Sequence, residues 1–154
     1  MILTQKETSL LEDIQKQEQL CVEKYEKCES EAYDPQLKSL FSSITDTEKK
    51  HLNTITDILN GNTPTVNVAQ DTASLPDSFR PVYGTLTSAE EKEHDKFLCS
   101  DSLATEKHVS SVYNTSIFEF SDEKVRHALN GIQAEEQHHG KILYDYMHTN
   151  GMYN

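Results

Sequence analysis

The sequence predicts an all-α protein: an antiparallel four-helix bundle made of two repeated helical hairpins joined by a long crossover. Three observations predict this fold. Four long segments carry inward positions at steps of three and four, short turns marked by Asp divide them into two pairs, and an irregular stretch separates the pairs. The 154 residues suffice for one domain with a buried core, which we place at residues 1–154.

The first hairpin is predicted to span residues 4–60. Its first helix, about residues 4–33, has one continuous, mainly apolar face. Asp34 and Pro35 then begin the second helix, because Asp is a good N-cap and Pro is tolerated at the first helical position. That helix is expected to end near Gly61, since glycine commonly terminates helices.

The crossover and the second hairpin follow. Residues 61–87 contain three scattered prolines among Ser and Thr and keep no helical period, so we expect a long connection there. The second hairpin is predicted at residues 88–149, with Asp122 as the N-cap of its second helix. The acidic run 90–95 is expected to complement the dipole at the start of the hairpin's first helix.

The second hairpin repeats polar positions of the first at a constant offset of 88 residues. The pairs are Glu18 with Glu106, Tyr25 with Tyr113, Asp34 with Asp122, Glu48 with Glu136, and His51 with His139. Apolar positions such as Phe41 and Leu129 follow the same offset. Two similar hairpins packed about a pseudo-two-fold axis would bring both sets to one centre.

The repeated glutamates interrupt otherwise apolar helix faces. Burying an unpaired carboxylate costs several kcal/mol, and no Lys or Arg occupies these faces, so a metal is the simplest counter-charge. Glu48 lies three residues before His51, which places both side chains on one helix face. Glu18 precedes Asp34 by 16 residues and Glu48 follows it by 14, so both lie at a similar height.

These residues predict a centre for two metal ions, either iron or manganese, because both metals accept carboxylate and imidazole ligands. We expect Glu48 and Glu136 to bridge the ions, with one histidine on each ion and one terminal glutamate on each. The histidines are His51 and His139, and the terminal glutamates are Glu18 and Glu106.

A second Glu-x-x-His motif, Glu135 with His138, lies one residue out of this register. Because one residue corresponds to about 100° of rotation, we place both side chains on the surface. For Tyr25 and Tyr113 two interpretations stay open: core packing, or a second-sphere hydrogen bond to a metal-binding carboxylate. The three cysteines, Cys21, Cys28 and Cys99, are expected to be small buried residues and not ligands.

The pattern Glu-x6-Tyr-x22-Glu-x-x-His, present twice, resembles the ferritin-like superfamily, which includes bacterioferritins, rubrerythrins and manganese catalases. That resemblance implies a ferritin-like bundle with a di-metal site. Val109 stands where rubrerythrin-like proteins carry an additional Glu, and no Cys-x-x-Cys is present. A symmetric six-residue site of the bacterioferritin or manganese catalase kind therefore fits better.

A closer resemblance is to clostridial spore coat proteins of the coat protein F type. Stretches at residues 3–7, 34–37, 95–101, 103–120 and 150–154 carry this likeness. It implies association with the spore coat and other spore coat proteins as partners. Synthesis in the cytoplasm is expected from the cysteines, since three of them with no Cys-x-x-Cys favour a reducing compartment. For assembly, a homodimer and a ferritin-like storage shell stay open.

Two functions remain as alternatives at this point. One is redox chemistry on O2 or H2O2, as in a ferroxidase, peroxidase or catalase, and the other is a structural coat component whose metal site is stabilising or vestigial. The net charge of -12 argues against nucleic acid and anionic membranes as partners. No apolar run approaches the ~20 residues that cross a bilayer, and no secretory signal is visible.

Overall fold

The computed structural model describes residues 1–65, 75–76, 78–84 and 88–153. Four α-helices and no strands occur among these residues, which confirms the all-helical prediction. The helices are α1 (Gln5–Glu31), α2 (Pro35–Leu59), α3 (Ala89–Ile117) and α4 (Glu123–Thr149). Their bounds lie within a few residues of those expected from the sequence.

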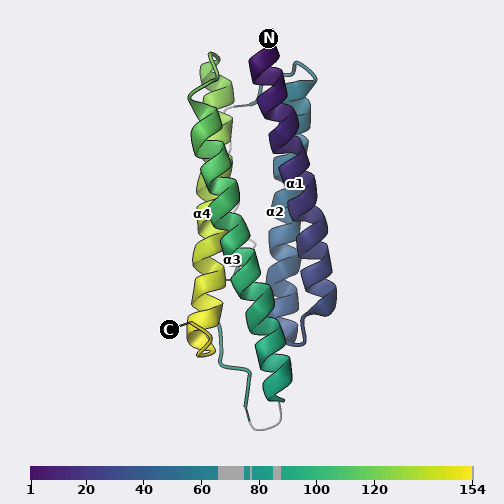
Figure 1. The fold of residues 1–154 in the computed structure, drawn as a ribbon, viewed down its shortest axis with the longest axis vertical. Coiled ribbons are helices and arrows are strands. Elements are labelled where there is room, and N and C mark those ends of the chain that lie inside the picture. Colours follow the sequence, from purple (N-terminus) through teal and green to yellow (C-terminus); the bar gives the residue numbers. More distant parts are fainter. Residues whose placement is uncertain (66–74, 77, 85–87, 154) are drawn as a thin grey trace.

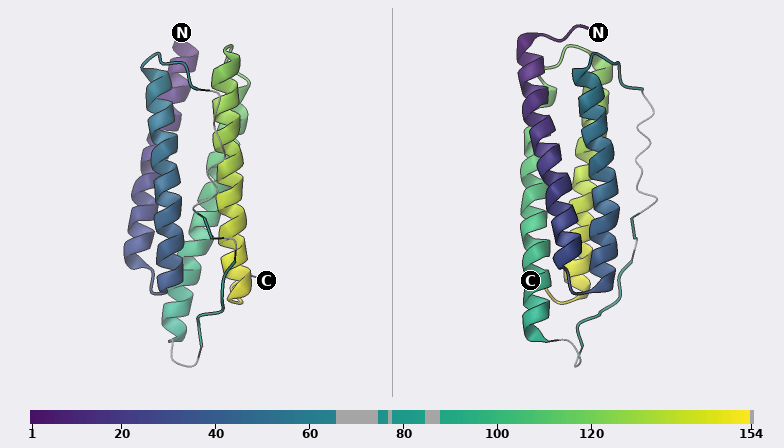
Figure 2. Two further views of the ribbon diagram at one scale, coloured as in Figure 1. Left: turned by 180° about the vertical axis from the view of Figure 1, so that it is seen from behind. Right: turned by 90° about the vertical axis from the view of Figure 1, so that its right-hand side faces the viewer.

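The helices associate in two pairs (Figure 1). α1 packs along α2 and α3 packs along α4, and the chain reverses direction at the short turn inside each pair. The pairs meet through contacts of α1 with α3 and of α2 with α4. The four helices thus lie side by side with their long axes roughly aligned, as the views in Figure 2 also show.

Part of the predicted crossover docks on the helices at the end of the bundle that holds the C-terminus (Figure 2). The Tyr83 hydroxyl donates to Asp95 Oδ2 at 2.6 Å and lies 2.8 Å from the Tyr146 hydroxyl. The Val82 amide donates to the Asn150 side chain at 3.0 Å. Residues 66–74, 77 and 85–87 of the predicted crossover lie outside the described residues.

The helix ends follow from local chemistry. The carboxylates of Asp34 and Asp122 accept backbone N–H groups in the first turns of α2 and α4, which confirms both predicted N-caps. Gly61 and Gly151 follow the ends of α2 and α4 with φ of 84° and 64°, a left-handed conformation that glycine adopts without steric cost.

The acidic run at the start of α3 divides into two roles. Ser88 is the N-cap and Glu91 completes a capping box with it, while Glu90 also lies in the first turn, as expected for acids at a helix N-terminus. Asp95 differs from the prediction. It is fully buried, because it faces the other hairpin one turn further along the helix.

Buried acids connect each hairpin to the turn of the other. Asp95 of α3 accepts the backbone N–H groups of Tyr33 and Asp34 at 2.9 and 3.0 Å, immediately before α2. Glu7 of α1 accepts the backbone N–H of Ser121 at 2.9 Å, immediately before the N-cap of α4. Glu7 and Asp95 are related by the 88-residue offset, so the two bonds are equivalent and reciprocal.

The apolar core forms two clusters that leave a polar layer between them. One contains Leu37 and Tyr146, and the other contains Leu11 and Ile132. Along every helix, the predicted metal ligands fall between residues of the two clusters. The polar layer is therefore covered by apolar side chains at both ends. All three cysteines are free and buried, as expected.

Candidate metal centre

The six predicted ligands lie together in the middle of the bundle, and each is at most 2% exposed. α1 and α3 contribute one glutamate each, whereas α2 and α4 contribute a Glu-x-x-His pair each. The side chains are Glu18, Glu48, His51, Glu106, Glu136 and His139.

These side chains form two overlapping groups. In each group the candidate ligand atoms lie within 4.8 Å of one another. The first group is Glu18, Glu48, His51 and Glu136, and the second is Glu48, Glu106, Glu136 and His139. Glu48 and Glu136 belong to both groups, which is the arrangement expected of residues that bridge two ions.

The imidazole nitrogens that face this cluster are both Nδ1. His51 Nδ1 lies 2.9 Å from Glu136 Oε1 and 3.2 Å from Glu48 Oε2. His139 Nδ1 lies 3.2 Å from Glu48 Oε1 and 3.5 Å from Glu106 Oε1. Each histidine therefore touches a carboxylate from the opposite hairpin, and the cluster is one site and not two half-sites.

Several buried atoms of the cluster have no hydrogen-bond partner within the part of the chain that the structure describes. They include one carboxylate oxygen, Oε2, on each of Glu18, Glu106 and Glu136. An unsatisfied buried carboxylate oxygen costs free energy, because it has lost water and gained nothing in return. Three such oxygens on residues of one cluster fit a cation, and oxygen and imidazole donors suit iron or manganese.

The carboxylates have opposite pKa shifts. Burial raises the pKa of Glu18 well above its usual value. Burial and the charge of Glu136 raise the pKa of Glu106 to about 8. Burial and the charge of Glu106 also act to raise the pKa of Glu48, but hydrogen bonds from His139 and His51 outweigh them and lower it to about 2.

Both histidines have a pKa well above the usual value. Burial alone would lower it, but for His51 the hydrogen bonds with Glu135, Glu136 and Glu48 dominate. For His139 the contacts with Glu106 are the largest opposing cause. Without metal, protons on the imidazoles thus offset part of the negative charge of the cluster. Cations entering this site would displace those protons.

The tyrosines connect the two hairpins at the cluster. The Tyr25 hydroxyl donates to Glu106 Oε1, and the Tyr113 hydroxyl donates to Glu18 Oε1. Both rings are fully buried, and burial raises the pKa of both phenols, so each stays a neutral donor. The two interpretations left open by the sequence are therefore compatible: the tyrosines pack in the core and also hydrogen-bond to the cluster.

The predicted surface position of Glu135 is wrong. Glu135 is only 7% exposed, and its Oε2 contacts Nε2 of His51, the ring nitrogen that faces away from the cluster. Each helix of a bundle has two neighbours, so its buried arc is wide enough to include a residue about 100° from the main face. His138, the other residue of that motif, is half-buried.

Glu135 makes the two halves of the centre unequal. The equivalent residue in the first hairpin is Thr47, whose hydroxyl bonds to the Ser43 carbonyl of its own helix at 3.4 Å. His139 Nε2 has no hydrogen-bond partner among the described residues, whereas His51 Nε2 has a carboxylate. A carboxylate on the outer nitrogen of a metal-binding histidine fixes the ring and raises its basicity.

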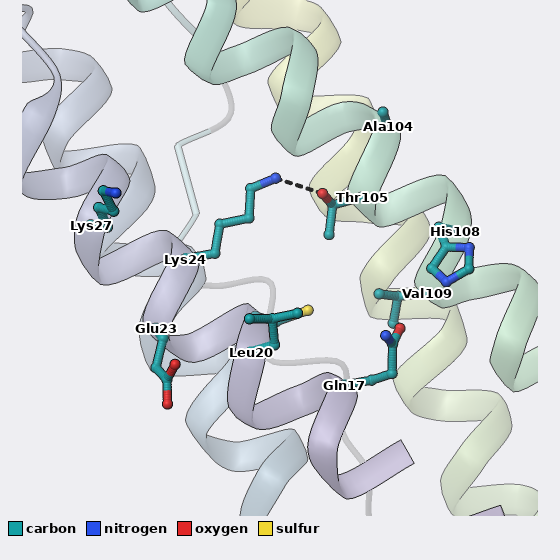
Figure 3. A pocket seen from close by; sticks show the side chains of 10 residues that line it. Gln17, Leu20, Glu23, Lys24, Lys27, Ala104, Thr105, His108 and Val109 are labelled. Carbon is teal, nitrogen blue, oxygen red and sulfur yellow. Dashed lines mark hydrogen bonds between the residues drawn. The ribbon is translucent and has the colours of Figure 1, made fainter. Parts of the chain in front are cut away.

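A groove of about 660 Å³ lies beside the cluster between α1 and α3 (Figure 3). Its lining includes Leu20, Cys21 and Val109, but none of the six predicted ligands. Lys24 spans the groove, and its ammonium donates to Thr105 Oγ1 and to Asp101 on α3. The groove therefore passes the cluster without opening onto it.

Fold and site together define an all-helical protein with a buried cluster of acidic and histidine residues that could bind metal. A family model, the Coat F domain, matches residues 94–154, a range that contains Glu106, Glu136 and His139. This match suggests association with the spore coat. Comparison with curated proteins and with solved structures found no match. Among the described residues, no helix combines the length and apolar character needed to cross a membrane.

Proposed function

We propose that this chain is a ferritin-like di-metal protein of the spore coat that turns over hydrogen peroxide or dioxygen. The observation that carries the proposal is the pair of overlapping ligand groups sharing Glu48 and Glu136, together with unpartnered carboxylate oxygens inside them. The match of residues 94–154 to the Coat F domain supports the association with the spore coat.

Each residue has a defined role in this proposal. Glu48 and Glu136 would hold both ions, while Glu18 with His51 and Glu106 with His139 would complete one position each. Tyr25 and Tyr113 orient the terminal glutamates by hydrogen bonds from the opposite hairpin. The apolar clusters on both sides of the layer exclude water from the carboxylates.

Bound iron or manganese would supply the redox chemistry. Dismutation of two H2O2 to two H2O and one O2 balances without an external reductant. It therefore suits a chain whose sequence contains no Cys-x-x-Cys for an electron-delivering iron domain. Displacement of protons from the histidines and from Glu106 would accompany ion binding, since metal ligands must be deprotonated.

A structural role is the second candidate, and the Coat F domain match is the observation that favours it. In that case the ions would link four helices and contribute folding free energy without turnover. The metal-free protein would then unfold at a clearly lower temperature than the loaded protein. This loss alone is expected under both functions, so stability cannot separate them.

The deciding experiment loads the protein anaerobically with Mn²⁺ or Fe²⁺, counts the ions per chain, and then adds H2O2 while recording O2 release. Two ions per chain and sustained turnover are expected, and Glu48→Ala and Glu136→Ala should abolish both. Glu23→Ala, an exposed residue of α1, is the matched control. Two bound ions without any reaction would favour the structural role, and no bound ions would refute the metal centre itself.

A further inference from the structure

A groove between α3 and α4 leads to the predicted metal ligands. It measures about 350 Å³, and its lining includes Leu103, Glu106, Ser110, Glu136 and Gly140. The Oε2 atoms of Glu106 and Glu136 are buried and have no hydrogen-bond partner in residues 1–65, 75–76, 78–84 and 88–153. The groove, which we call the α3–α4 groove, therefore ends at two carboxylates that have unused acceptor capacity.

Gly140 lies in the wall of this groove, inside α4. Its backbone is helical, so the conformation does not require glycine. A Cβ at this position would lie 3.5 Å from Leu103 Cδ1, an ordinary van der Waals contact, so close packing does not require glycine either. Glycine inside a helix is destabilising relative to alanine. What a larger side chain would change here is the space in the groove.

The first hairpin has a different surface at the equivalent place. At the 88-residue offset, Leu52 corresponds to Gly140 and Val22 corresponds to Ser110. The groove between α1 and α2 includes Leu52 in its lining but contains none of the six predicted metal ligands. Larger apolar residues therefore occupy these two positions in the hairpin whose groove does not reach the centre.

Charge at the α3–α4 groove also indicates what enters it. Lys107 lines the groove and is exposed, so its ammonium adds positive charge where the groove meets solvent. The Glu106 and Glu136 carboxylates at the inner end would be matched by bound metal. A small anion, or a small molecule that ionises to one, is thus favoured over a large or cationic ligand.

We propose that the α3–α4 groove at Gly140 is the route by which a small exogenous ligand of azide or peroxide size reaches the metal centre. This inference rests on the proposed metal function. It adds that access is one-sided: the second hairpin admits the ligand, and Leu52 and Val22 close the first.

The test uses the full-length protein loaded with Co²⁺ and mixed rapidly with azide, and the rate of azide binding is followed in the visible spectrum of the metal. Gly140→Leu and Ser110→Val copy the residues of the first hairpin. Each is expected to keep the Co²⁺ stoichiometry of wild type and to slow azide association by about tenfold or more, because the route is filled. Gly140→Ala is the matched control, since its Cβ fits, and should bind azide at the wild-type rate.

The possible outcomes distinguish a failure of the groove proposal from a failure of the proposed metal centre. Wild-type rates of azide association in Co²⁺-loaded Gly140→Leu and Ser110→Val would overturn the groove proposal and leave the metal centre intact. Loaded wild-type protein that binds no azide would do the same. Wild-type protein that binds no Co²⁺ would overturn the metal centre and the groove proposal with it. If Gly140→Leu fails to fold, Ser110→Val decides, because valine replaces serine at a half-buried position.

Discussion

The Tyr25 hydroxyl donates a hydrogen bond to the Glu106 carboxylate, and this bond crosses from the first hairpin to the second. Tyr113 makes the equivalent bond to Glu18 in the opposite direction. Each terminal glutamate is therefore oriented by a residue that its own hairpin does not contain. The same two hydrogen bonds therefore stabilise the cluster and hold the two hairpins together.

Removing one of these hydroxyls should destabilise the metal-free protein. Tyr25→Phe leaves a buried Glu106 oxygen without its donor, and the free energy of unfolding is expected to fall by about 1–3 kcal/mol. Urea unfolding of metal-free protein measures this change. Tyr144→Phe is the control, because Tyr144 is 38% exposed. Equal stability of the two variants would contradict the role of the bond.

Replacing a glutamate that belongs to both ligand groups should remove more bound metal than replacing a glutamate that belongs to one group. Glu48 belongs to both ligand groups and Glu18 to one. Glu18→Ala is therefore expected to retain about one ion per chain, whereas Glu48→Ala retains none. Metal analysis after gel filtration distinguishes these results. Identical ion counts in the two variants would show that the groups do not correspond to separate metal positions.

Glu135 should strengthen only one of the two metal positions. Glu135→Gln weakens the support of His51 Nε2, so affinity at the His51 position is expected to fall about 10–100-fold. The His139 position should keep its affinity. Thr47→Ala, at the equivalent site of the first hairpin, is the matched control and should change neither. A competition titration that gives two equally weakened positions in Glu135→Gln would disprove this asymmetry.

Glu7 should stabilise the protein in a pH-dependent manner. Hydrogen bonds from the Ser121 and Thr4 backbones lower its pKa from 4.5 to about 2. Because the folded pKa is lower than the unfolded one, the stabilisation is complete above pH 4.5 and is lost as the pH falls toward 2. Glu7→Gln should therefore cost about 1–3 kcal/mol at neutral pH. The cost should shrink below pH 4.5.

Urea unfolding at a series of pH values tests the Glu7 prediction. Glu12→Gln is the control, since Glu12 lies in the same helix and is exposed. The control should match wild type across the range. A difference between Glu7→Gln and wild type that stays constant down to pH 3 would show that the carboxylate charge is not responsible.

The helices and the six predicted ligands could be placed from the sequence because both depend on periodicity. A residue's distance from Asp34 or Asp122 sets its height, and its position in the 3.6-residue period sets its face. These two quantities are sufficient to predict that Glu18 lies near Glu48. The 88-residue repeat predicts the same proximity for Glu106 and Glu136.

Contacts between the hairpins could not be placed in the same way. Whether Tyr25 bonds within its own hairpin or across the bundle depends on how the two hairpins meet, which periodicity within a helix does not specify. Glu135 and Asp95 were misplaced for the same reason. Both face the opposite hairpin, at angles that look peripheral when a helix is considered alone.

The reciprocal bonds of Glu7 and Asp95 have a consequence for any division of the chain. Each acid accepts a backbone N–H group from the turn of the other hairpin. Each tyrosine likewise donates a hydrogen bond to a glutamate of the other hairpin. Cutting the chain between α2 and α3 would therefore not produce two smaller proteins with half a site each. It would produce two fragments, each lacking the partner for a buried acid and a buried hydroxyl, and neither would be an autonomous folding unit.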